Sequence, residues 1–104
     1  MNRCPVESHL VKDIWHATTP GSFNYYERAG VRGLAGLIYL CPCGCGRLGA
    51  LQFDKPGKDA RAAWQWDGNI LKPTLTPSIR CKVSCKFHGY LTKGIWTFCE
   101  DSGR

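Results

Sequence analysis

Two short stretches decide the fold of this chain: Cys41-Pro42-Cys43-Gly44-Cys45-Gly46 and Cys85-Lys86-Phe87-His88-Gly89. Structural zinc sites use four Cys or His ligands in a tetrahedron, and these ligands usually come as close pairs. The two stretches therefore predict one metal site that joins distant parts of the chain. In a chain of 104 residues, which can bury only a modest core, such a site would supply a large part of the stability.

Five residues compete for the four ligand positions: Cys41, Cys43, Cys45, Cys85 and His88. Cys85-x-x-His88 has ordinary spacing for one pair, and the other pair is Cys41-x-Cys43 or Cys43-x-Cys45. We favour Cys43, Cys45, Cys85 and His88, with Cys41 left to point into the core, but spacing alone keeps the choice open. Thiolate-rich tetrahedral coordination favours one Zn²⁺ ion over iron.

Composition indicates one small folded domain, expected over residues 1–104. The hydrophobic fraction of 43% argues against a disordered chain. Twelve glycines and six prolines divide the sequence into short segments, which favours strands and turns over long helices. We therefore expect a small mainly-β domain, built of hairpins like a zinc ribbon and stabilised by one metal site.

The sequence also predicts a compartment. No apolar run approaches the roughly 20 residues that a membrane helix needs, and the first residues lack the apolar stretch of a signal peptide. We expect a cytoplasmic protein, in a bacterium or an infected host cell, and no membrane partner. Thiols stay reduced there, so seven cysteines point to metal rather than to disulfides.

Apolar segments flank both stretches and predict hairpins. Residues 37–40 and 49–53 lie on either side of the first stretch and should form a hairpin with a metal knuckle at its tip. Residues 91–98 should form a second hairpin that turns at Lys93-Gly94. Residues 10–15 form a plausible first strand.

Two further segments are expected to be irregular. Residues 71–79 contain two prolines, which exclude a central strand and leave an edge strand or an irregular segment. The polar tail from residue 100 to 104 is expected to be frayed.

Four motifs together carry a resemblance: CPCGCG at 41–46, W-x-W at 64–66, PTLTPSI at 73–79 and C-x-x-HGYLTKGIW at 85–96. In this combination the chain resembles an uncharacterised family of small proteins of phages and bacteria, whose members often carry the misleading label "ammonia monooxygenase". The resemblance covers roughly residues 37–99. It implies a compact zinc-binding domain and does not imply oxygenase chemistry.

The metal site predicts a role in binding rather than catalysis. A catalytic zinc needs an open coordination position and a nearby base, whereas this chain offers a surplus of ligands and no pair of acid and base carboxylates. His16 is interpreted as an ordinary histidine at the end of a strand. We therefore expect a protein that is not an enzyme: a small zinc-binding module, encoded by a phage, that binds a host or phage protein as an accessory factor or inhibitor.

Nucleic-acid binding is the first alternative. The net charge is +6, and Arg80, Lys82, Lys86 and Lys93 surround the second stretch, where they could contact a phosphate backbone. However, the basic residues are spread thinly and form no run.

A Rieske-like [2Fe–2S] protein for electron transfer is the second alternative. Cys85-Lys86-Phe87-His88-Gly89 resembles the second half of the Rieske motif, C-x-x-H-G. The first half would be Cys43-Gly44-Cys45, which lacks the second histidine that a Rieske iron requires.

Overall fold

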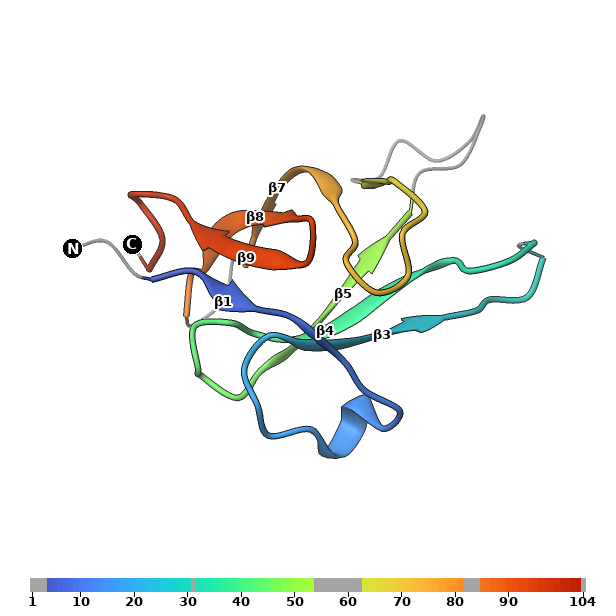
Figure 1. Cartoon of the computed structure of the whole chain (residues 1–104), viewed down its shortest axis with the longest axis horizontal. Coiled ribbons are helices and arrows are strands. Elements are labelled where there is room, and N and C mark those ends of the chain that lie inside the picture. The colour runs from blue at the N-terminus through green and yellow to red at the C-terminus, as the bar shows by residue number, and fades with distance from the viewer. Residues whose placement is uncertain (1–3, 31, 54–62, 82–84, 104) are drawn as a thin grey trace.

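The computed structural model describes residues 4–30, 32–53, 63–81 and 85–103. These residues form short strands and a single 3-10 turn (Figure 1). In chain order the elements are β1 (Val6–Glu7), β2 (His9–Leu10), η1 (Ile14–His16), β3 (Ser22–Tyr26), β4 (Gly36–Leu40), β5 (Leu48–Gln52), β6 (Gln65–Trp66), β7 (Leu75–Arg80), β8 (His88–Thr92) and β9 (Ile95–Phe98). The expected small mainly-β fold is confirmed.

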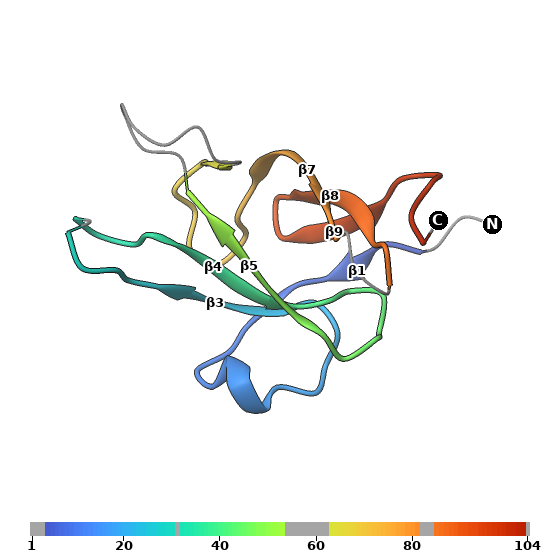
Figure 2. The same ribbon diagram turned by 180° about the vertical axis from the view of Figure 1, so that it is seen from behind.

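The strands form two sheets. One has the order β2-β3-β4-β5 and the other the order β1-β9-β8-β7-β6. Neighbouring strands are antiparallel, except that β2 and β3 are parallel. Figures 1 and 2 show β3, β4 and β5 in one layer and β1, β7, β8 and β9 in the other. One face of each sheet therefore packs against the other sheet.

The hydrophobic core lies between these two sheets. Leu37 and Tyr39 of β4 meet Leu91 of β8 and Trp96 of β9 in one cluster of buried residues. The rings of Tyr39 and Trp96 have their centroids 5.0 Å apart. The indole Nε1 of Trp96 donates a hydrogen bond of 3.0 Å to the carbonyl oxygen of Gly21, just before β3. Trp96 therefore joins the two layers by both packing and a hydrogen bond.

Both expected hairpins are present. β4 and β5 flank the first Cys-rich stretch, with Leu37 paired to Leu51 and Leu40 to Leu48. β8 and β9 turn where the sequence has Lys93-Gly94, with Thr92 paired to Ile95. Local signals, an apolar strand on either side of a glycine-containing turn, were sufficient to predict these elements.

The expected strand over residues 10–15 is wrong. β2 ends at Leu10, and Ile14–His16 forms the 3-10 turn η1. The side chain of Asp13 accepts a hydrogen bond of 3.1 Å from the backbone N–H of Trp15. This capping bond favours a turn, because Asp offers the backbone a local partner in place of a strand ladder.

The expectation that residues 71–79 cannot form a central strand is also wrong. β7 lies between β6 and β8. Its pairing with β8 is interrupted between Leu75 and Ile79, where the register shifts. Pro77 falls inside this irregularity, so its missing N–H removes no bond of the β7–β8 ladder. The bulge thus makes a proline compatible with an internal strand.

The tail is not frayed as far as residue 103. The backbone N–H of Gly103 donates to the carbonyl oxygen of Lys86 at 2.7 Å, and that of Ser102 donates to Cys99 at 3.0 Å. The Ser102 hydroxyl accepts a bond of 3.1 Å from the backbone N–H of His88. The tail therefore folds back on the beginning of β8, which polarity alone did not indicate.

Within the described parts of the chain, no helix has the length and apolar character needed to cross a bilayer.

Replacing Trp96 by Phe should lower the free energy of unfolding by about 2–3 kcal/mol, through a partly filled cavity and a lost hydrogen bond. The same change at Trp15, whose exposed fraction is 68% against 0% for Trp96, should change it by less than about 0.5 kcal/mol. Urea unfolding of both variants measures the difference. Equal effects would contradict the role given to Trp96.

Candidate active site and metal centre

Four cysteines from the two sheets meet at one point, which we call the cysteine cluster: Cys41, Cys43, Cys45 and Cys85. Cys41 directly follows β4, Cys43 and Cys45 lie in the turn before β5, and Cys85 lies just before β8. Their four sulfur atoms all lie within 4.8 Å of one another. The Sγ atom of Cys41 is 3.2 Å from that of Cys43 and 3.7 Å from that of Cys85.

The four sulfur atoms are close enough together to hold a single metal ion, and the short distance between Cys41 and Cys43 would lengthen when the ion binds. Four thiolates around an ion at about 2.3 Å stand about 3.8 Å apart in a tetrahedron, close to the separation of Cys41 and Cys85. Burial raises the pKa of the Cys41 thiol above its usual range. A bound ion would supply the positive charge that makes a buried thiolate favourable. The cluster could therefore hold one metal ion, and it lacks the two imidazoles of a Rieske centre.

His88, the fifth predicted ligand, does not lie in this group. The structure therefore brings together four of the five candidates, including Cys41, which we had favoured least among the first three cysteines. Which of them bind a metal stays a prediction.

His88 instead lies between a serine and an aspartate. Its Nε2 atom is 3.1 Å from Ser78 Oγ, and its Nδ1 atom is 2.6 Å from Asp101 Oδ1. We call Ser78, His88 and Asp101 the triad. Ser78 lies in β7, His88 begins β8, and Asp101 lies in the returning tail. Three separate segments therefore build one continuous line of polar contacts.

The pairing of β7 with β8 places the serine beside the histidine. Arg80 is directly opposite His88 in the ladder. Ser78 is two residues before Arg80, so both side chains lie on the same face of β7, opposite the face on which Ile79 is buried. A residue diagonal to its cross-strand neighbour is within reach of a long or planar side chain, and the bulge at 76–78 brings Ser78 to His88.

A charged group fixes the other end of the triad. Arg80 Nη2 donates to Asp101 Oδ2 at 2.6 Å. The hydrogen bond with His88, and then that with Arg80, lower the pKa of the Asp101 carboxyl below its usual range. An ionised carboxylate can only accept hydrogen bonds, so the shorter contact, 2.6 Å to Asp101, assigns the proton to Nδ1 of His88. Arg80 Nη2, which is 3.0 Å from the same nitrogen, then donates to Asp101 rather than to the ring. Nε2 of His88 is then free to accept the proton of the Ser78 hydroxyl.

The surroundings hold His88 in place while leaving it accessible. Its side chain is 18% exposed and that of Asp101 is 48% exposed. Ser102 binds the backbone N–H of His88, and Phe87, the preceding residue, is completely buried. The imidazole therefore has a fixed orientation and is partly open to solvent.

The triad can perform nucleophilic catalysis. A histidine that is oriented by a carboxylate can take the proton of a serine hydroxyl as the oxygen attacks a carbonyl carbon. By its fold and site, the molecule is a small two-sheet β protein with the Ser–His–Asp arrangement of a serine hydrolase.

A comparison with protein families agrees with this site. The family described as bacterial ubiquitination-like system serine protease (BubE) matches residues 10–99, so the chain belongs to the BubE family. The match includes Ser78 and His88, whereas Asp101 lies just beyond it. Comparisons with curated proteins and with solved structures found no match.

Membership of this family corrects the expectation about enzyme activity and supports part of the expected family resemblance. The expectation that the protein is not an enzyme is wrong, because its family is described as a serine protease. The resemblance to a small bacterial family is confirmed in that general form, and the matched segment extends further towards the N-terminus than residues 37–99. Phage origin stays a prediction.

Sequence reasoning missed Ser78 and Asp101 and assigned His88 to the metal. The C-x-x-H spacing made a ligand the simpler interpretation of His88. The one local signal was the Ser78-Ile79-Arg80 alternation, which places two polar side chains on one face around a buried one. Asp101 lies in a tail that gave no such signal.

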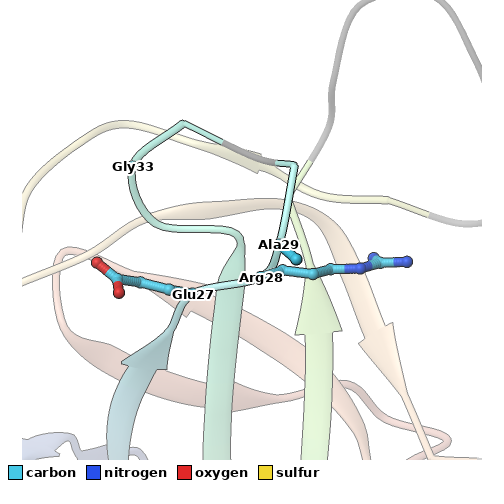
Figure 3. Close-up of a pocket in the computed structure, with 4 residues that line it drawn as sticks. All are labelled: Glu27, Arg28, Ala29 and Gly33. Atoms are coloured by element: carbon cyan, nitrogen blue, oxygen red, sulfur yellow. The ribbon is translucent and has the colours of Figure 1, made fainter.

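One hollow lies in the loop that joins β3 to β4, and no residue of the triad lines it. It has a volume of about 410 Å³, lies between β3 and β4, and is lined by Glu27, Arg28, Ala29 and Gly33. Figure 3 shows the side chains of Glu27 and Arg28 pointing to opposite sides of the loop. No titratable side chains converge there, so we assign it no chemistry.

A smaller hollow of about 270 Å³ is lined by Gln65, Trp66, Asp67, Thr74 and Thr76. Thr76 lies two residues before Ser78 in β7, whereas none of the residues that line the hollow belongs to the triad.

The structure describes some, but not all, of the basic residues considered for nucleic-acid binding. Lys82 lies outside the described residues. Arg80 is paired with Asp101, which gives it a role within the site. Contact with nucleic acid through this region stays a prediction.

Replacing Cys85 by Ser should lower the free energy of unfolding by more than about 4 kcal/mol, because loss of a structural metal is among the largest single effects. A strong chelator should have the same effect on the unaltered protein. Cys4→Ser is the matched control, since Cys4 is exposed and outside the cluster. Thermal unfolding with metal analysis measures both effects; a chelator without effect would contradict a structural metal.

Proposed function

We propose that this protein is a serine protease in which Ser78 is the nucleophile, His88 the general base and Asp101 the group that orients His88. The observation that carries the proposal is the unbroken line of contacts from Ser78 Oγ through both ring nitrogens of His88 to Asp101. Arg80 acts as a positioning residue, since it holds the second oxygen of Asp101.

The reaction follows from these positions. His88 Nε2 takes the proton of Ser78 as Oγ forms a bond to the carbonyl carbon of the substrate. The protonated imidazole then gives that proton to the leaving nitrogen, and the C–N bond breaks to leave an acyl-enzyme. Water attacks this ester with His88 again as the base, which releases the acid and restores Ser78. Asp101 stabilises the imidazolium in both halves of the reaction.

The substrate that we propose is the modifier protein of a bacterial ubiquitination-like system, cut at a peptide or isopeptide bond. Support comes from the family description and from the surface beside the triad. Tyr90 is 45% exposed and lies in β8 between the residues paired to Leu75 and Ile79, opposite the bulge. With the hollow next to Thr76, it offers an open platform for an extended tail rather than a closed pocket.

We further propose that the cysteine cluster holds one Zn²⁺ ion with a structural role. Four thiolates complete its tetrahedral coordination and leave no open position, as in structural rather than catalytic sites. The cluster would hold Cys85, and through the buried Phe87 would fix where His88 begins β8. The ion takes no part in the reaction itself.

Ser78→Ala should abolish labelling by a fluorophosphonate probe, which reacts with an activated serine, and should lower hydrolysis of a modifier-derived C-terminal amide at least about 10³-fold. Ser8→Ala is the matched control, since the Ser8 hydroxyl donates to the carbonyl oxygen of Gly94 at 2.6 Å and Ser8 lies outside the triad. Labelling that persists in Ser78→Ala would contradict the assignment of the nucleophile.

Asp101→Asn should lower kcat by at least about 10²-fold with little change in KM, because the amide no longer fixes the Nδ1 proton of His88. Asp13→Asn is a close control, since Asp13 Oδ2 also contacts a histidine, His16 Nδ1, at 2.7 Å. Steady-state kinetics of the two variants measure the effect. Equal kcat values would remove Asp101 from the triad.

A further inference from the structure

A second group of metal-binding atoms lies at the triad itself. His88, Cys99 and Asp101 each offer a ligand atom, and these atoms all lie within 4.8 Å of one another. Cys99 directly follows β9, and its backbone N–H donates to the carbonyl oxygen of His88 at 2.8 Å. The thiol is therefore held beside the triad, although the proposed reaction has no use for it.

We propose that His88, Cys99 and Asp101 form an inhibitory site for Zn²⁺ or a similar divalent ion, which switches the protease off. The inference rests on the proposed function. One imidazole, one thiolate and one carboxylate are ligands that Zn²⁺ prefers, and three protein ligands leave a fourth position for water. The binding nitrogen is Nδ1, because it faces Asp101 whereas Nε2 faces Ser78.

Binding at Nδ1 removes the base. In the metal-free protein the Nδ1 proton points at Asp101, and the lone pair of Nε2 faces Ser78. A metal ion needs the lone pair of Nδ1, so the neutral ring must carry its proton on Nε2. Nε2–H is a donor and cannot accept the proton of Ser78. One ion at Nδ1 therefore stops catalysis without touching the serine.

The metal-bound and active arrangements exclude each other by distance. Nδ1 and Oδ1 are 2.6 Å apart in the hydrogen-bonded state. Two such ligands on one Zn²⁺ ion stand about 3.3 Å apart. The ion must therefore replace the proton and separate His88 from Asp101, which breaks the contact that orients the base.

The charge around the site favours reversible binding. The guanidinium of Arg80 lies 3.0 Å from His88 Nδ1 and 2.6 Å from Asp101 and opposes a second positive charge. This repulsion makes the site weaker than the cysteine cluster.

The test compares Cys99→Ser with Cys4→Ser, both first loaded with one equivalent of Zn²⁺. In the unaltered protein and Cys4→Ser, excess Zn²⁺ should lower the rate of amide hydrolysis at least tenfold. Cys99→Ser should keep the activity without added metal and need at least tenfold more Zn²⁺ for half inhibition. Cys99→Ala is a second variant, should the serine disturb the fold. The proposal would be overturned if both Cys99 variants were half-inhibited at the same Zn²⁺ concentration as the unaltered protein.

A binding measurement separates this inference from the proposed function. Co²⁺ added to the zinc-loaded protein should give the near-ultraviolet absorption of a thiolate–cobalt bond, and Cys99→Ser should show only the background from exchange at the cysteine cluster. This absorption without any hydrolysis would support the metal site and contradict the protease. Hydrolysis without Cys99-dependent absorption would contradict the metal site alone.

Discussion

The approach of Cys85 to Cys41, at 3.7 Å between sulfur atoms, is the contact on which the rest of this structure depends. It ties the β4–β5 hairpin of one sheet to the beginning of β8 in the other. A chain of 104 residues has a small core and little stability to spare. The proposed four-thiolate metal site would add a cross-link at the edge of that core. It would fix the start of β8, where the completely buried Phe87 is followed at once by His88.

The triad is a consequence of that fixed position and of two further constraints. The β7–β8 register sets Arg80 opposite His88, and the bulge before Ile79 brings Ser78 to the same ring. The tail then returns across β8, with Ser102 bound to the backbone of His88 and Asp101 to its side chain. Arg80 connects the β7–β8 ladder with the tail, because it lies opposite His88 in the ladder and also donates a hydrogen bond to Asp101 in the tail. The site therefore depends on the β7–β8 ladder, on the bulge within that ladder and on the C-terminal tail that folds back over β8.

The residues of the cysteine cluster and those of the triad were hard to distinguish in the sequence, because members of both lie close together along the chain. Cys85 and His88 stand near each other on one segment, and both are common zinc ligands. Their side chains nevertheless belong to different groups: Cys85 lies in the cysteine cluster, and His88 contacts Ser78 and Asp101. The interpretation of C-x-x-H as a ligand pair was reasonable from spacing. The structure places His88 with Ser78 and Asp101 rather than with the cysteine cluster, a contact that the spacing of Cys85 and His88 did not indicate.

The sequence by itself determined the β hairpins around the two stretches and pointed to a meeting of the first stretch with Cys85, but it left open which of the five candidates would gather there. These features depend on turns, apolar strands and ligand types that lie close together along the chain. Only the tertiary structure decided that Ser78, His88 and Asp101 meet, and that Pro77 is tolerated in an internal strand. The reason is that these outcomes depend on the register of one strand against another and on where the tail packs. Register and packing follow from the whole core, and no local pattern of residues encodes them.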